Sequence, residues 1–123
     1  MAKKNTDPAY LENLKLYESL VFTNPEVERK GASMPYTSRN GHMFSFLDKS
    51  GKMCLRLPTQ EREAFLAQFK TKTSEQYGTI MKEYVDIPAS LLHATVELKK
   101  YYDISFEYIA TLKPKATTRK KRV

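Results

Sequence analysis

The segment 40–66 constrains the fold more than any other part of the chain, because it joins two strand-like runs, a turn and a helix start. Residues 43–47 and 53–57 each alternate between two sets of side chains with a period of two, which is typical of β-strands. The residues from Asp48 to Gly51 suit a tight turn, since Asp favours its first position and Gly accepts a positive φ. This segment therefore predicts an antiparallel hairpin.

A helix is expected directly after the hairpin. Pro58 has no N–H to donate, so it ends strand pairing. Thr59 suits the N-cap position of a helix. Apolar side chains then recur at spacings of three and four, at Phe65, Leu66 and Phe69. One side of this helix is therefore predicted to cover the hairpin.

Helices are also expected near both ends of the chain. The first is predicted over residues 7–22, with an apolar stripe at Tyr10, Leu11, Leu14, Tyr17, Leu20 and Val21. The last helical region is predicted over residues 88–112, with a break near 93–95.

Further strands are assigned from short runs between bends, at residues 27–30, 32–36, 75–77 and 80–87. In the last of these, Met81, Val85 and Ile87 are predicted to face the core together. Helices set apart between groups of strands indicate an α+β fold: a two-layer α/β sandwich on an antiparallel sheet, in the order α-β(3)-α-β(2)-α.

The charge of the chain is unevenly distributed. Of its 21 Lys and Arg residues, six lie between positions 113 and 122, where there is no acidic residue; the other 15 nearly balance the 14 Asp and Glu. We therefore expect one nearly neutral domain over residues 1–112 and a basic, disordered tail over 113–123.

Bulk features favour a protein of the cytoplasm. The N-terminus has no apolar signal-like region, and no apolar run approaches the roughly 18 residues that span a bilayer, so no membrane association is expected. The single cysteine, Cys54, excludes an internal disulfide and fits a reducing compartment.

No catalytic or metal-binding residues are predicted. His42 and His93 lack neighbouring ligands at metal-site spacing, and Cys54 is expected to be a buried, inert thiol. Glu61 and Glu63 are two positions apart on a helix and cannot converge as an acid–base pair. No nucleotide-binding motif occurs, so no cofactor is expected and an enzyme is less favoured than a binding protein.

Two sets of residues are candidates for binding. Basic side chains interleaved with aromatic rings can stack on bases or hold phosphate, and such a surface is predicted at Tyr36, Arg39, Arg56, Lys82 and Tyr84. The basic tail is the second candidate, as a nonspecific nucleic-acid contact through Lys113, Lys115, Arg119, Lys120, Lys121 and Arg122.

Several motifs resemble the TfoX N-terminal domain family and, more distantly, the MmcQ/YjbR group. They are Asn40-Gly41-His42-Met43-Phe44, Gly51-Lys52-Met53, Leu55-Arg56-Leu57, and Met81-Lys82-Glu83-Tyr84-Val85 before Ile87-Pro88. The similarity spans roughly residues 10–115 and is greatest to small stand-alone members. It implies the same α-β(3)-α-β(2)-α order.

The resemblance implies little about the function of this chain. The namesake is a regulator of DNA-uptake competence that pairs this domain with a second, C-terminal one, and no second domain is expected here. Where the family commonly has Met-Phe-Gly-Gly, this chain has Met34-Pro35-Tyr36-Thr37, so a ligand role of that glycine-rich turn is not transferred. The family implies no catalytic residues.

Three functions are compatible with these features. The favoured one is a non-enzymatic binding or regulatory module that contacts nucleic acid through its tail. The second is a small-molecule-binding protein or small enzyme with a pocket near Tyr36, Arg39 and Arg56. The third is a protein-interaction module that forms a homodimer.

Overall fold

The computed structural model describes residues 7–31, 34–76 and 78–113. The order of elements agrees with the predicted α-β(3)-α-β(2)-α arrangement, and the last helical region is divided in two near the expected break. The elements are α1 (Pro8–Val21), β1 (Tyr36–Arg39), β2 (His42–Leu47), β3 (Met53–Arg56), α2 (Thr59–Phe69), β4 (Thr73–Gln76), β5 (Thr79–Asp86), α3 (Ala89–Leu92) and α4 (Thr95–Ala110).

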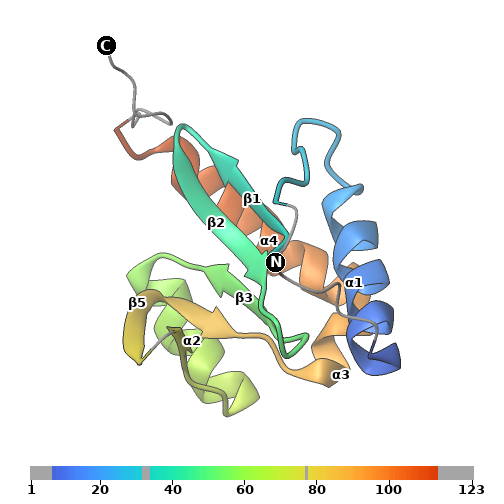
Figure 1. Ribbon diagram of the computed structural model, residues 1–123. Helices are drawn as coiled ribbons and strands as arrows, with labels where there is room; N and C mark the ends of the chain where they lie inside the picture. The colour runs from blue at the N-terminus through green and yellow to red at the C-terminus, as the bar shows by residue number, and fades with distance from the viewer. Residues whose placement is uncertain (1–6, 32–33, 77, 114–123) are drawn as a thin grey trace.

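The five strands form one antiparallel sheet in the order β1-β2-β3-β5-β4. In Figure 1, α2 and α4 lie behind this sheet, and α1 and α3 lie along its right-hand side. The main core fills the space between the sheet and the helices. The predicted two-layer α+β fold is therefore confirmed, and the sheet has one face covered by helices and one that the described helices leave open.

The hairpin at the centre of the sheet is as predicted. β2 and β3 pair in antiparallel register, and the Gly51 N–H donates to the Asp48 carbonyl at 2.9 Å. Gly51 has a φ of +90°, a conformation that glycine adopts without strain. On β3, Met53 and Leu55 face the main core and Cys54 faces the opposite side, which follows the period-two pattern.

The predicted alternation along β2 is broken by a β-bulge. Thr37 pairs with Ser45 and the next residue, Ser38, pairs with Met43, so Phe44 is an extra residue without a partner in β1. A bulge changes which side of the sheet the following side chains face. Phe44, Ser45 and Leu47 consequently all lie on the helix-covered side, while Met43 and Phe46 lie on the open side.

Three expectations for individual elements are wrong. Residues 27–30 do not form a strand: Lys30 makes only an isolated bridge to Tyr36. The N-cap of α2 is Pro58, with Thr59 as the first helical residue and without a side-chain cap. Finally, β4 begins at Thr73 rather than at residue 75.

Two side chains also lie elsewhere than the sequence predicts. Leu11 is 41% exposed, although it belongs to the apolar stripe of α1. Met81 packs on the open side of the sheet, whereas Val85 and Ile87 are in the main core. The reason is that β5 is irregular, since its residues 82–84 have no partner in β4. The alternation of side chains between the two faces of the sheet is therefore interrupted between Met81 and Val85.

The C-terminal end of α4 is held by the turn between β1 and β2. Arg39 Nη1 donates to the Phe106 carbonyl at 2.9 Å, Asn40 Nδ2 to the Ile109 carbonyl at 3.3 Å, and His42 Nε2 to the carbonyl of Lys113 at 2.8 Å. These three hydrogen bonds tie the β1–β2 turn to the C-terminal part of α4 and to Lys113 beyond it.

A chain of hydroxyl groups links α1 to the first two strands inside the core. Tyr17 Oη lies 2.7 Å from Ser45 Oγ, which lies 2.5 Å from Thr37 Oγ1, and all three residues are fully buried. Burial raises the pKa of the Tyr17 phenol well above its ordinary value of 10.0, although the hydrogen bond from Ser45 acts in the opposite direction. Ser45 is therefore the shared partner of two buried hydroxyls.

Replacing Ser45 should be more harmful than removing either hydroxyl that it contacts. Ser45→Ala leaves both Tyr17 and Thr37 without their partner and should lower the free energy of unfolding by about 2 kcal/mol. Tyr17→Phe leaves the Thr37–Ser45 bond in place and should cost about 1 kcal/mol. Urea unfolding measures both, with exposed Ser90→Ala as the control. A cost of Ser45→Ala no larger than that of Tyr17→Phe would contradict this assignment.

Candidate functional site

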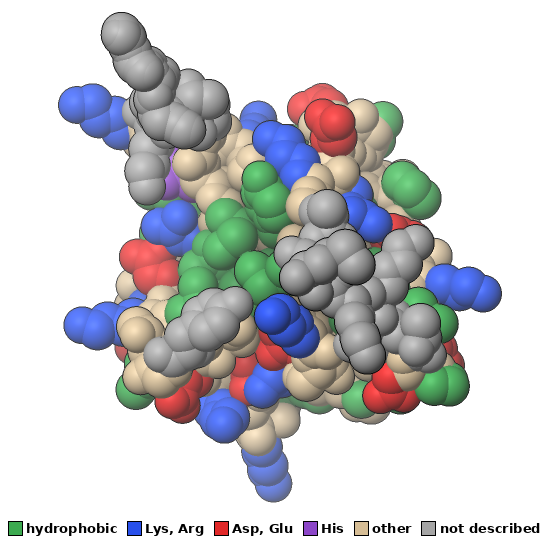
Figure 2. All heavy atoms as spheres, in the orientation of Figure 1, with side chains coloured by type: hydrophobic (Ala, Val, Ile, Leu, Met, Phe, Trp, Pro, Cys, Tyr) green, Lys and Arg blue, Asp and Glu red, His purple; other side chains and the backbone are tan. Residues whose placement is uncertain are grey.

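The open side of the sheet carries an apolar surface, which we call the open-face cluster. Its floor is formed by the buried side chains of Phe46, Cys54 and Tyr84, and the Phe46 and Tyr84 rings lie 5.6 Å apart. Around this floor are four partly buried side chains: Met34, Tyr36, Met43 and Met81. Figure 2 shows hydrophobic side chains gathered in the middle of this side of the molecule, over β1, β2 and β3.

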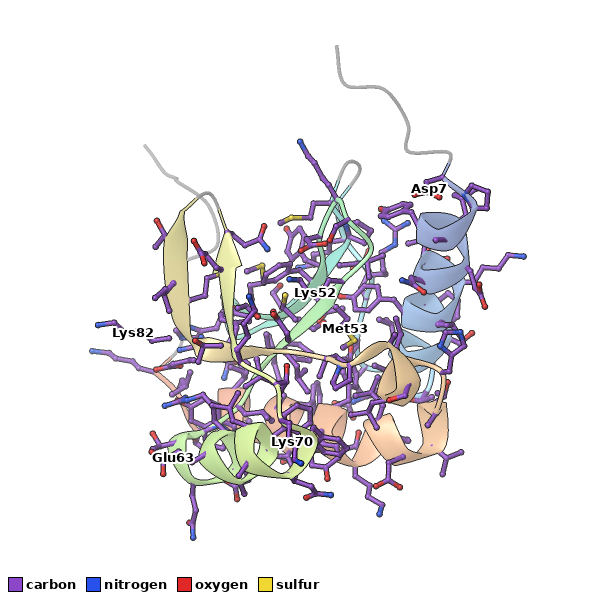
Figure 3. The ribbon with its side chains drawn as sticks, turned by 90° about the horizontal axis from the view of Figure 1, so that it is seen from below. Asp7, Lys52, Met53, Glu63, Lys70 and Lys82 are labelled. Atoms are coloured by element: carbon purple, nitrogen blue, oxygen red, sulfur yellow. The ribbon has the colours of Figure 1, made fainter. Side chains whose placement is uncertain are left out.

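The β4–β5 hairpin borders this surface on one side. β5 pairs with β3 only through residues 84–86, while residues 79–81 pair with β4. Figure 3 shows that the hairpin consequently stands away from the layer of α2 and α4. Because Met81 belongs to the open-face cluster, the hairpin adds a side wall to a surface that would otherwise be flat.

Two of the predicted surface residues, Tyr36 and Tyr84, belong to the open-face cluster. The Tyr84 hydroxyl donates to the Met43 carbonyl at 2.5 Å, which fixes its ring across β2. Burial raises the pKa of Tyr84 to about 12, so the phenol stays protonated at neutral pH and keeps its proton for this hydrogen bond. Tyr36 is half-buried.

The three predicted basic residues differ in the groups that they contact. The Arg39 guanidinium lies 3.8 Å from the centre of the Phe106 ring on α4. Arg56 pairs with Glu83 at 2.6 Å, and its guanidinium is 5.9 Å from the Tyr108 ring. Lys82 is exposed and points outward from β5, as Figure 3 shows. Arg56 also lies directly opposite Tyr84 in the pairing of β3 with β5, so it is beside one of the two predicted tyrosines.

The five other members of the cluster were not predicted as binding residues: Met34, Met43, Phe46, Cys54 and Met81. They come from four separate segments of the chain. The bulge in β2 and the irregularity in β5 bring them to one side, and neither is visible in the period-two patterns.

A polar group adjoins the open-face cluster at the β2–β3 turn. Asp86 is nearly buried, and its carboxylate lies 3.4 Å from Lys52 Nζ and 3.7 Å from Cys54 Sγ. The predicted burial of the Cys54 thiol is confirmed, and this burial raises its pKa to about 12. Partial burial alone would lower the pKa of Lys52, but the nearby Asp86 carboxylate stabilises its charged form and the pKa is raised.

Asp48 holds the same turn together with its side chain. Its Oδ1 accepts from the N–H and hydroxyl of Ser50 and from the N–H of Lys52, and its Oδ2 accepts from Gln76 Nε2. Burial alone would raise the pKa of this carboxyl group, but the hydrogen bonds outweigh it and the pKa is lowered from 3.8. The ionised form is therefore the one that the folded chain prefers.

The remaining sequence predictions concern residues at the chain's end and metal ligands. Only Lys113 of the six basic tail residues belongs to the described part of the chain; Lys115, Arg119, Lys120, Lys121 and Arg122 lie outside it. Within residues 7–31, 34–76 and 78–113, no group of three or more His, Cys, Asp or Glu side chains is placed to hold a metal ion. No helix in these ranges is long and apolar enough to cross a membrane.

Comparison of the chain with protein-family models, with curated proteins and with solved structures gives no match in any of the three searches. The site is therefore interpreted from its own geometry.

The lowered pKa of Asp48 gives stability a defined dependence on pH. Asp48→Asn should cost about 1–2 kcal/mol at about pH 7, because the donors around it lose a charged acceptor. A depressed folded-state pKa contributes stability above the unfolded value of 3.8 that is lost as the pH falls through the folded value. The cost of Asp48→Asn should therefore shrink at about pH 3.

Urea unfolding of both chains at the two pH values measures this difference. Glu75→Gln, which changes an exposed carboxylate on the neighbouring β4, is the matched control and should have almost no effect. A cost of Asp48→Asn that is equal at both pH values would exclude a role for the ionised carboxylate.

Proposed function

We propose that this protein is a non-catalytic binding module of regulatory type, and that it holds an apolar segment of a partner protein on the open face of its sheet. The observation that carries this proposal is the open-face cluster, an apolar surface on the side of the sheet that the described helices do not cover. The resemblance to the TfoX N-terminal domain family is compatible with such a role and stays a prediction, as does the cytoplasmic location.

The composition of the cluster favours a protein partner. Three of the chain's five methionines lie in it: Met34, Met43 and Met81. Methionine is unbranched and polarizable, so a methionine-rich surface adapts to apolar segments of different shape. The floor below these side chains is aromatic and rigid. Such a surface can recognise an apolar peptide by contact area without demanding one sequence.

The charges around the cluster argue against a polyanion at this face. Lys52 is paired with Asp86 and Arg56 with Glu83, while Arg39 is stacked on α4. A nucleic-acid backbone is bound mainly by cations that exchange counterions for phosphate. Here Lys52, Arg56 and Arg39 already have intramolecular partners. Because Arg39 and Arg56 have these partners, their guanidinium groups are less available for a pocket built with Tyr36.

The methionine methyl groups provide the test. Peptides selected from a random phage-displayed library against the full chain would be titrated into protein carrying ¹³C-labelled methionine methyl groups. We expect shifts at Met34, Met43 and Met81, while Met53 in the main core stays unchanged. Met81→Glu should weaken binding at least about 10-fold, because it places a charge in the contact.

The matched control is Val96→Glu, which makes the same kind of change at an 86% exposed side chain on α4 and should leave binding intact. Recovery of no peptide, or shifts confined to other methyl groups, would refute the proposal. Shifts of the same three methyl groups on concentrating the protein alone would replace the peptide by a second copy of this chain, which is the homodimer predicted as an alternative.

The basic tail supports a second, separate function: nonspecific contact with nucleic acid. Six basic residues lie between positions 113 and 122 without an acidic one. The adjoining surface would not extend this contact, because the groove between α2 and the C-terminal half of α4 carries three carboxylates, from Glu61, Asp103 and Glu107. Any contact with phosphates should therefore depend on the tail alone.

This predicts a particular salt dependence. If all six tail cations contact phosphates, the logarithm of the affinity for duplex DNA should fall with the logarithm of salt concentration with a slope of about −5. A full-length variant with glutamine at the six positions should lose binding. Fluorescence anisotropy of a labelled duplex at two salt concentrations measures both. Unchanged binding by the variant, or none by the wild type, would end the proposal for the tail.

A further inference from the structure

A cleft lies at the end of the molecule opposite the C-terminal end of α4. It has a volume of about 430 Å³ and opens between the C-terminal end of α2, the β2–β3 turn and the start of α3. Volumes of this size hold small organic molecules. Figure 3 looks onto this end of the molecule and labels Lys52, Met53 and Lys70, which belong to its lining.

The inner wall of the cleft is apolar and its rim is polar. The apolar part consists of Met53, Phe69, Ile87, Pro88, Ala89 and Leu92. The polar part consists of Asn13, Ser50, Lys52, Lys70, Thr71 and Asp86. An apolar interior with a few polar groups at the rim is the usual composition of a small-molecule site.

Most of the neutral polar groups at the rim are already engaged. Asn13 Nδ2 donates to the Gly51 carbonyl, the Ser50 hydroxyl donates to Asp48, and the Thr71 hydroxyl donates to the Asp86 carbonyl. These bonds hold the side chains in place and shape the rim, and they use the single donor of each of the two hydroxyls and one of the two N–H donors of Asn13. The charged side chains are therefore the main groups left to recognise a ligand.

Those charged side chains are two cations and one anion. Asp86 pairs with Lys52, and no ion pair within the described residues engages Lys70, which is exposed. Lys52 directly precedes β3 and Lys70 is the C-cap of α2, and both residues line the cleft. One positive charge is thus left uncompensated at its rim, and an anionic group is the ligand that would complement it.

The backbone at Lys70 is unusual for a lysine. As C-cap of α2 it has a φ of +52°, in the left-handed region where glycine or asparagine is the common residue. A lysine there is less favourable for the fold than glycine. This strain makes Lys70 a good position for a test, because its replacement by glycine should improve folding while removing the charge.

We infer that this cleft is a binding site for a small organic anion, a carboxylate or phosphate ester with a short apolar body, whose charged group contacts Lys70. Its apolar body lies toward Phe69 and Ala89. The site is distinct from the open-face cluster: Asp86, Lys52 and the β2–β3 turn separate the two, and its ligand is a small molecule rather than a protein segment. It does not depend on the function proposed above.

The probes are hexanoate and hexyl phosphate, with inorganic phosphate and hexanol as controls that keep only the charge or only the apolar body. In the full chain with ¹³C-labelled methionine methyl groups, both anionic probes should shift the Met53 resonance, with a dissociation constant of about 1 mM. The two controls should bind at least about 10-fold more weakly, as each lacks one of the two interactions. A stronger shift with one head group identifies which anion the site prefers.

Lys70→Gly should weaken the binding of the anionic probes about 10-fold. It should also raise the midpoint of urea unfolding, so the loss of binding cannot be ascribed to misfolding. Lys82→Gln removes one positive charge from an exposed site outside the cleft and should leave binding unchanged.

Three outcomes would overturn the inference. They are no shift of Met53 with either anion, equal affinity of Lys70→Gly, and shifts confined to Met34, Met43 and Met81. The last would place the probes on the open face, so failure of the cleft and failure of the peptide surface give different spectra.

Discussion

The structure depends on a single extra residue in β2. Because the bulge places Phe44 opposite no partner, Phe44 and Ser45 both face the helices, where one packs against Tyr102 and the other completes the buried hydroxyl chain. The same bulge leaves Met43 and Phe46 on the other side. One irregularity thus completes the core and creates the apolar open face. In a regular strand Phe44 and Phe46 would face the same side of the sheet, and the other side would lose one of these two apolar side chains.

The local part of this design is readable from the sequence, and the long-range part is not. The central hairpin and the order of elements follow from periods, prolines and turn residues within short windows. The bulge has no such signature, since one inserted residue in a run of apolar side chains leaves the pattern strand-like. The partners of Arg39 and Arg56 are equally invisible, because Phe106 and Glu83 meet them only in the folded chain. A basic side chain in a sequence therefore does not indicate a free charge.

The distribution of free charge has a functional meaning. Within the domain, cations near the open face are used for ion pairs and for α4, which leaves that surface neutral and apolar. Lys70 at the cleft has no such partner among the described residues. The three candidate sites thus differ in chemistry. The open face offers apolar contact area, the cleft offers one positive charge, and the tail sequence offers six positive charges. Each proposal therefore names a different class of ligand, and the experiments above separate the three.

The attachment of α4 to the β1–β2 turn has a consequence for how the chain is made. Arg39, Asn40 and His42 bind carbonyls that follow them by 67, 69 and 71 positions. On the ribosome, the first three strands emerge while the helix that covers them is still unsynthesised. Domains assemble as units once their sequence is available, and distant contacts are the slow ones. The helix side of the hairpin therefore lacks α4 until the residues that follow it by 67 to 71 positions have been synthesised, and in this interval the newborn chain exposes apolar side chains that chaperones can protect.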